Sequence, residues 1–270
     1  ELAVPLNCGD LPSGRGYALV RSADALGIGM GAFMGTIAAS IGQLRLVYGV
    51  EAICMASVLI LISVQPLLDE RPMPQGTHSE SSTGKLDLTW LPPLLPVLVV
   101  SVVATGILSL QQSALPLDLV KGGLERPGLS ESHSSALIAF QLTLLVLLQW
   151  PVGRWLSERS VGFGLSLSLV SFATGCTLIG LSALSASGTG LVMVALLPMA
   201  FAQAAFLPTA TEAVVEETPP EHRGLAMAMF SQCFALSAMA APVVGGNLLD
   251  QQGHGLTLWI GVAAISLAVL

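Results

Sequence analysis

The longest uncharged segment of the chain lies between Arg159 and Glu212, where 52 consecutive residues contain no Asp, Glu, Lys or Arg. As one helix this segment would be about 78 Å long, whereas the hydrocarbon core of a membrane is about 30 Å thick and is crossed by about 20 apolar residues. The segment must therefore fold back on itself. Residues 185–190 (SASGTG) supply the small and polar residues of a turn near its middle.

Shorter uncharged segments divide the rest of the chain in the same way. They contain 20, 17, 30, 22 and 26 residues, and the last 20 residues are also uncharged. Only 10% of the chain is charged and 53% is hydrophobic, whereas a soluble domain is about one quarter charged. A single water-soluble core is therefore excluded. Because the apolar runs are continuous and not alternating, they favour helices over a barrel.

These segments predict an all-α, polytopic transmembrane helical bundle, a multi-pass protein of a plasma or inner membrane. The eight predicted spans are residues 18–41, 46–66, 92–116, 134–151, 161–183, 190–211, 224–248 and 256–270.

Other functions are disfavoured by what the sequence lacks. The net charge is −7 and only two lysines are present, so nucleic acid is not an expected partner. The four histidines and four cysteines are scattered without metal-ligand spacing. No P-loop, G-x-S-x-G or H-E-x-x-H pattern occurs. We therefore expect neither a metal, a cofactor nor an enzyme activity.

The distribution of basic residues predicts which loops face the cytoplasm. Short cytoplasmic loops are enriched in Lys and Arg. One set of loops holds seven of the ten basic residues, and the other set holds Arg45, Lys121 and Arg126. This difference places residues 1–17, the 67–91 loop, the 152–160 loop and the 212–223 loop in the cytoplasm.

A short motif occurs twice in the chain. The pattern P-x-x-R-G-x-A is present at residues 12–18 and again, 208 positions later, at residues 220–226. Each copy opens a span rich in small residues on the predicted cytoplasmic side. The repeat predicts two pseudo-symmetric halves related by an axis along the membrane normal.

Four segments carry a resemblance to a known family: PSGRGYALVRSADALG (12–27), LPLDL (115–119), GRWLSERSVGFG (153–164) and PPEHRGLAMAMFSQCFALSAMAAPVVGG (219–246). With these segments the chain resembles helices 5 to 12 of the major facilitator superfamily of secondary transporters. The resemblance implies that residues 1–66 end the N-terminal half, 67–91 form a cytoplasmic linker, and 92–270 form the six-helix C-terminal half with a truncated last helix. We interpret the chain, which starts at Glu1, as a fragment that lacks the first four helices.

Two signatures of that family are only partly present. The loop motif beginning at Gly153 has Ser157 at the position of its Asp. The drug-antiporter motif of helix 5 aligns with residues 31–40, without its Pro and final glycines.

Amide side chains inside the predicted spans are the candidates for contact with a transported solute. Polar groups are costly in hydrocarbon and usually face a bundle interior or an aqueous cavity. An amide both donates and accepts, which suits neutral polar or zwitterionic solutes. Hydrogen bonding between helices is the alternative role. The candidates are Gln111, Gln112, Gln141, Gln149, Gln203 and Gln232.

Charged and small residues provide three further groups of candidates. Asp24 is the candidate for ion or proton coupling, with an ion pair to Arg21 as the alternative. A cytoplasmic gate formed with nearby glutamates, or simple anchoring at the membrane surface, is expected for Arg15, Gly153, Arg154, Arg159 and Arg223. Close helix packing is expected at Gly27, Gly31, Gly35, Ala241, Pro242, Gly245 and Gly246.

The sequence thus predicts a monomeric secondary active transporter that moves a small molecule across a lipid bilayer by alternating access. We expect coupling to a gradient, with a proton or another ion transported alongside or in exchange, and an efflux or multidrug-type permease is one form of this hypothesis. The alternative is a membrane scaffold or sensor on the same fold that does not transport.

Overall fold

The structure, a computed structural model of the chain, describes residues 45–64 and 89–270 together with scattered positions between 19 and 34. Those scattered positions are helical, and they include Asp24, Gly27 and Gly31. Arg15, Gly35 and the first copy of the repeat lie outside the described residues, and so do residues 65 and 66 and residues 67–88 of the predicted linker.

Helix α3, which extends from Arg45 to Val64, is described by itself because it belongs to a different unit from the helices that follow. It coincides with the predicted span at residues 46–66. Its most apolar stretch is Tyr48–Leu61. Most of its described side chains are exposed.

Within residues 89–270 the other unit contains a bundle of six α-helices. Their bounds are α4 Leu91–Lys121, α5 Glu131–Leu156, α6 Val161–Ser182, α7 Gly188–Glu216, α8 Arg223–Gln252 and α9 Leu256–Ala268, with a short 3-10 helix η1 at Pro220–His222. The first five α-helices of this unit are long and apolar enough to cross a membrane, and α9 has 13 residues. The prediction of an all-α, multi-pass bundle is therefore confirmed.

Local sequence determines where these helices begin and end. The hydroxyl groups of Ser130 and Ser160 accept hydrogen bonds from the first turns of α5 and α6, which satisfies amide groups that lack a partner within the helix. Gly122 and Gly253 follow α4 and α8 with φ angles of 88° and 74°, a conformation that favours glycine. Several helices are longer than the predicted spans, since they continue into polar residues beyond the apolar segments.

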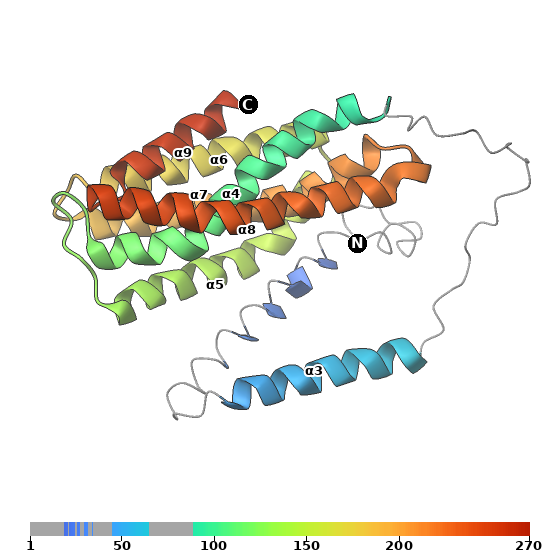
Figure 1. The fold of residues 1–270 in the computed structure, drawn as a ribbon, viewed down its shortest axis with the longest axis horizontal. Coiled ribbons are helices and arrows are strands. Elements are labelled where there is room, and N and C mark those ends of the chain that lie inside the picture. Colours follow the sequence, from blue (N-terminus) through green and yellow to red (C-terminus); the bar gives the residue numbers. More distant parts are fainter. Residues whose placement is uncertain are drawn as a thin grey trace, which may run out of the picture. The chain divides into compact units, whose positions relative to one another are not determined.

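The helices pack as neighbours in a definite pattern (Figure 1). Helix α7 packs against α5 and α6, α6 also packs against α9, and α4 packs along α8. The large side chains of Phe172, Phe206, Phe230 and Trp259 are completely or almost completely buried between them. A Cβ atom built on Gly175 of α6 would lie only 2.4 Å from the Cγ atom of Met199. The close contact between α6 and α7 therefore depends on the absence of a side chain at Gly175.

The connections of the bundle lie at its two ends. The α4–α5, α6–α7 and α8–α9 connections share one end, which we call the Arg126 end. The α5–α6 and α7–α8 connections share the opposite end, which we call the Arg223 end.

Candidate functional site

A pair of buried amides joins α4 to α5 inside the bundle. Gln111 of α4 and Gln141 of α5 are 5% and 6% exposed. The Nε2 atom of Gln141 donates to Oε1 of Gln111 at 3.0 Å. The Nε2 atom of Gln111 is also buried, and it has no hydrogen-bond partner in the part of the chain that the structure describes. The pair therefore retains a free donor within an apolar environment, where an unpaired polar group is costly.

Gln149 has a different environment, between α5 and α7. Its side chain is 1% exposed, and its Nε2 atom donates to the backbone oxygen of Ala204 at 3.4 Å. The structure thus places Gln149 against the backbone of a neighbouring helix.

The remaining candidate glutamines are spread over three helices. Gln112 of α4 and Gln232 of α8 are exposed on the isolated bundle, and Gln203 of α7 is half-buried. The structure therefore brings Gln111 and Gln141 together but does not gather all six amides at one place.

The contact between α4 and α8 is made by small and hydroxyl-bearing residues. Thr105 Oγ1 lies 2.8 Å from Ser237 Oγ and donates to the carbonyl oxygen of Cys233 at 3.3 Å. About two turns after Ser237 in α8, a Cβ atom on Gly245 would lie 2.9 Å from the Cβ atom of Ala114. The two backbones therefore approach closely at Gly245.

The other small-residue candidates have different environments. Ala241 is buried and Pro242 is exposed. A Cβ atom on Gly246 would have no neighbouring heavy atom within 4 Å, and the same holds for Gly27 and Gly31 among the described residues.

Basic residues at the Arg223 end contact backbone carbonyls and aromatic rings. The Nε atom of Arg223 donates to the carbonyl oxygens of Val215 at 3.2 Å and Thr218 at 3.4 Å. These carbonyls belong to the last turn of α7 and the loop after it, so Arg223 helps to satisfy the end of that helix. The ring of His222 stacks on Trp90 at 5.1 Å, which joins the starts of α4 and α8.

The α5–α6 connection carries a second cluster of basic and aromatic residues. The guanidinium of Arg159 lies over the rings of Trp155 and Phe163, 5.5 and 5.9 Å from their centroids. Arg154 is exposed and Gly153 is buried. Trp and Arg side chains of this kind are typical of a membrane–water interface.

A buried ion pair at the Arg126 end was not expected from the sequence. Asp118 at the end of α4 and Arg126 in the following loop are 1% and 0% exposed, and Arg126 Nη2 lies 3.1 Å from Asp118 Oδ2. The carboxylate also accepts hydrogen bonds from Gly255 N at 2.9 Å and from Trp259 Nε1 at 3.2 Å. Arg126 in turn donates to Ser182 Oγ at 2.5 Å and to the Asp118 carbonyl at 2.9 Å. One ion pair therefore connects the ends of α4 and α6 to the start of α9.

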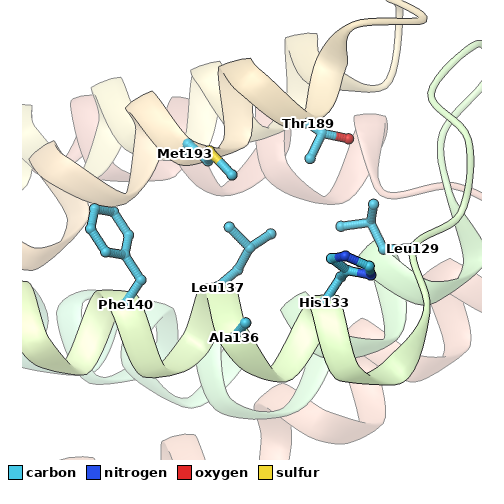
Figure 2. A pocket seen from close by; sticks show the side chains of 7 residues that line it. All are labelled: Leu129, His133, Ala136, Leu137, Phe140, Thr189 and Met193. Atoms are coloured by element: carbon cyan, nitrogen blue, oxygen red, sulfur yellow. The ribbon is translucent and has the colours of Figure 1, made fainter.

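Among the residues that the structure describes, the linings of two hollows on the bundle include no candidate glutamine. A cavity of about 340 Å³ lies between α5 and α7 near the Arg126 end. Figure 2 shows Thr189 and Met193 on one side of it and His133, Ala136, Leu137 and Phe140 on the other. A second hollow of about 250 Å³ lies between α4, α8 and α9 and is mainly apolar. Both could hold apolar groups, but they lack the convergent polar side chains that would define a solute site.

No group of three or more His, Cys, Asp or Glu side chains in the described ranges could hold a metal ion.

Comparison with known proteins adds one match to this geometry. The model of the Major Facilitator Superfamily matches residues 97–270, which include nearly all of the α4–α9 bundle. No curated protein and no solved structure matches the chain. The family match covers more than half of the chain and agrees with its apolar helices, so this is an integral, multi-pass membrane protein. The chain belongs to the major facilitator superfamily, and it is a transporter of that type, which handles small-molecule substrates in a lipid bilayer.

Proposed function

We propose that the protein moves a small neutral polar or zwitterionic solute by alternating access, driven by a solute or ion gradient. In this proposal the Arg223 end of the bundle faces the cytoplasm, as the distribution of basic residues indicates. The protein acts as a monomer. Residues 92–270 act as the C-terminal half of the transporter, residues 1–66 as the end of its N-terminal half, and residues 67–91 as the linker between them.

The Gln111–Gln141 pair is the observation on which this proposal depends. One amide hydrogen-bonds the other, and the Nε2 atom of Gln111 remains without a partner among the described residues. A solute with a carbonyl, hydroxyl or carboxylate oxygen would supply the missing acceptor. Binding would then satisfy a buried donor that is otherwise unpaired, which favours polar solutes over purely apolar ones.

Residues on three helices extend this site into a path across the membrane. We assign the exposed amides Gln112 and Gln232 and the half-buried Gln203 to the wall of the path. The small-residue contact of α4 with α8, centred on Gly245, lets these helices remain closely packed while the two halves move. Ion coupling is assigned to Asp24, and the basic residues of the Arg223 end, together with Arg15 and Gly153, form the cytoplasmic closure.

Cysteine accessibility in sealed vesicles tests this proposal without knowledge of the solute. In the full-length protein, with every native cysteine replaced by serine, Gln112→Cys and Gln232→Cys should each react with a membrane-impermeant maleimide. Reaction should occur both in right-side-out and in inside-out vesicles, because a path with alternating access opens to each side in turn. A protein that retains only the native Cys176, which is completely buried, is the matched control and should not react from either side.

Two results would contradict the proposal. Either Gln112→Cys and Gln232→Cys react only after the membrane is dissolved in detergent, or they react from a single side under every condition. The first result would mean that no aqueous path reaches these positions. The second would mean that the path does not open to the two sides in turn.

A further inference from the structure

Helix α7 contains a proline, Pro208, that leaves one backbone carbonyl of the helix without its usual hydrogen-bond donor. Pro208 lies inside α7. A proline nitrogen carries no hydrogen, so Pro208 cannot donate to the carbonyl oxygen four residues earlier, on Ala204. In hydrocarbon no water is present to satisfy that oxygen, and a proline within a membrane helix is tolerated where a neighbouring group does so.

The side chain of Gln149 provides a donor at this position. Its Nε2 atom lies 3.4 Å from the Ala204 oxygen and comes from α5, the helix packed beside α7. The side chain of Gln149 is 1% exposed. A buried amide is costly unless it is hydrogen-bonded, and this carbonyl is a partner that the neighbouring helix itself leaves open.

The surroundings of Gln149 are otherwise apolar. Leu145, Val152 and Leu156 of α5 pack with Ala204 and Ala205 of α7 in a small hydrophobic cluster separate from the main core. The two alanines have short side chains, which allows α5 to approach the α7 backbone closely. The polar amide therefore lies within an apolar contact, at the place where the α7 backbone lacks a donor.

Helix α6 also packs closely against the same segment of α7. A Cβ atom on Gly164 of α6 would lie 2.8 Å from Cγ2 of Thr209, the residue that follows Pro208. The segment of α7 around Pro208 is thus in close contact with both α5 and α6.

We propose that Gln149 is a positioning residue, which supplies to α7 the hydrogen-bond donor that Pro208 removes. It thereby fixes the backbone of α7 at Pro208 against α5. This role takes the place, for Gln149, of the solute contact expected from the sequence, and it does not depend on which solute the protein carries. It follows that the effect of replacing Gln149 on the stability of the α7 backbone depends on the residue at position 208.

A double-mutant experiment on the full chain in lipid nanodiscs tests this dependence. The variants are Gln149→Leu, Pro208→Ala and the two combined, and the readout is amide hydrogen exchange in residues 201–212. Gln149→Leu alone should accelerate exchange there about tenfold, which corresponds to about 1.4 kcal/mol. In the Pro208→Ala background the same substitution should change exchange by less than about twofold, because the backbone amide gained at position 208 now donates to the Ala204 oxygen.

A matched control separates this effect from the general effect of removing an amide. Gln251→Leu makes the same chemical change at an exposed position of α8, and it should leave exchange in residues 201–212 unchanged. If Gln149→Leu cannot be recovered as folded protein, adding Pro208→Ala should restore its recovery.

Three results would overturn the proposal. Gln149→Leu could accelerate exchange equally in both backgrounds, it could have no effect in the native background, or Pro208→Ala could fail to restore the recovery of a misfolded Gln149→Leu protein. Each result would mean that Gln149 does not substitute for the missing donor of Pro208.

Discussion

Replacing Arg126 with leucine should lower the stability of the protein far more than replacing Lys121 with leucine. Both residues form an ion pair with an aspartate at the Arg126 end of the bundle, Arg126 with Asp118 and Lys121 with Asp250. The two pairs differ in burial. The Arg126–Asp118 side chains are 0% and 1% exposed, and those of Lys121 and Asp250 are 37% and 76% exposed.

The burial of each pair sets the expected magnitude. Removing one partner of a buried ion pair leaves an uncompensated charge and costs about 3–5 kcal/mol. In Arg126→Leu the Asp118 carboxylate would keep only Gly255 N and Trp259 Nε1 as donors among those the structure shows. An exposed ion pair contributes about 0–1 kcal/mol. The melting temperature should therefore fall by on the order of 10 °C in Arg126→Leu and by a few degrees at most in Lys121→Leu.

The double variant Asp118→Leu/Arg126→Leu shows whether the loss of stability comes from leaving one buried charge without its partner or from removing the side chain itself. Because this variant leaves no unpaired charge, its loss of stability should be clearly smaller than the sum of the two single losses. Stability can be followed in detergent as the fraction of protein that remains monodisperse after heating. The reasoning would be refuted if Arg126→Leu and Lys121→Leu melted at the same temperature. It would also be refuted if the stability lost in the double variant equalled the sum of the losses in Asp118→Leu and Arg126→Leu.

Three further predictions concern packing and local contacts in the bundle. Gly245→Ala should destabilise the protein by about 1–3 kcal/mol because its new Cβ atom would meet Ala114, whereas Gly246→Ala should be neutral or stabilising by up to about 1 kcal/mol. The two variants are compared by thermal melting, and equal melting temperatures would argue against a close approach of α4 and α8 at Gly245. Arg223→Ala should insert normally in the membrane, transport more slowly and lose about 1–2 kcal/mol of stability through its lost carbonyl contacts. If solute flux and thermal melting of this variant both equalled those of the native protein, Arg223 would have neither a gating nor a stabilising role. Cys176, which is completely buried, should resist a thiol-reactive dye until the protein unfolds, so labelling of folded protein at that position, detected by peptide mass spectrometry, would contradict the packing of α6.

The helices could be predicted from the sequence because membranes impose a simple length requirement. The 52-residue uncharged segment between Arg159 and Glu212 had to contain two spans, and the structure divides it into α6 and α7 at the predicted turn. The resemblance to the major facilitator superfamily is likewise confirmed by the family match over residues 97–270. Composition and spacing sufficed here because they determine which segments lipid can surround.

Contacts between side chains far apart in the sequence could not be predicted in this way. Asp118 and Arg126 look like ordinary charges near a span end and in a loop, since nothing local indicates that the loop folds back over α4. Their other partners, Ser182 and Trp259, are 56 and 141 positions from the residues they contact. A signal was present in LPLDL, where an aspartate lies in the last turn of an apolar helix, but its meaning depends on the packing of α9.

The glutamines illustrate the same limit. All six amides were singled out by their polarity within the predicted spans. Only the packing of α5 against α4 and α7 distinguishes Gln141, which is paired with another amide, from Gln149, which is paired with a backbone oxygen. Pro208 was a clue in the sequence to the position of Gln149, because a proline inside a membrane helix frees a carbonyl oxygen that a neighbouring helix can satisfy.

Solute flux in proteoliposomes tests the central claim of gradient-coupled transport most directly. Vesicles containing the full-length protein are loaded with a mixture of polar metabolites, a proton or sodium gradient is imposed, and the solutes on each side are measured by mass spectrometry. The account predicts that at least one polar solute moves against its concentration gradient, that an ionophore abolishes this movement, and that Gln111→Leu/Gln141→Leu reduces it about tenfold or more. Movement that is unaffected by the ionophore and by the double variant, or no movement under any gradient, would contradict it.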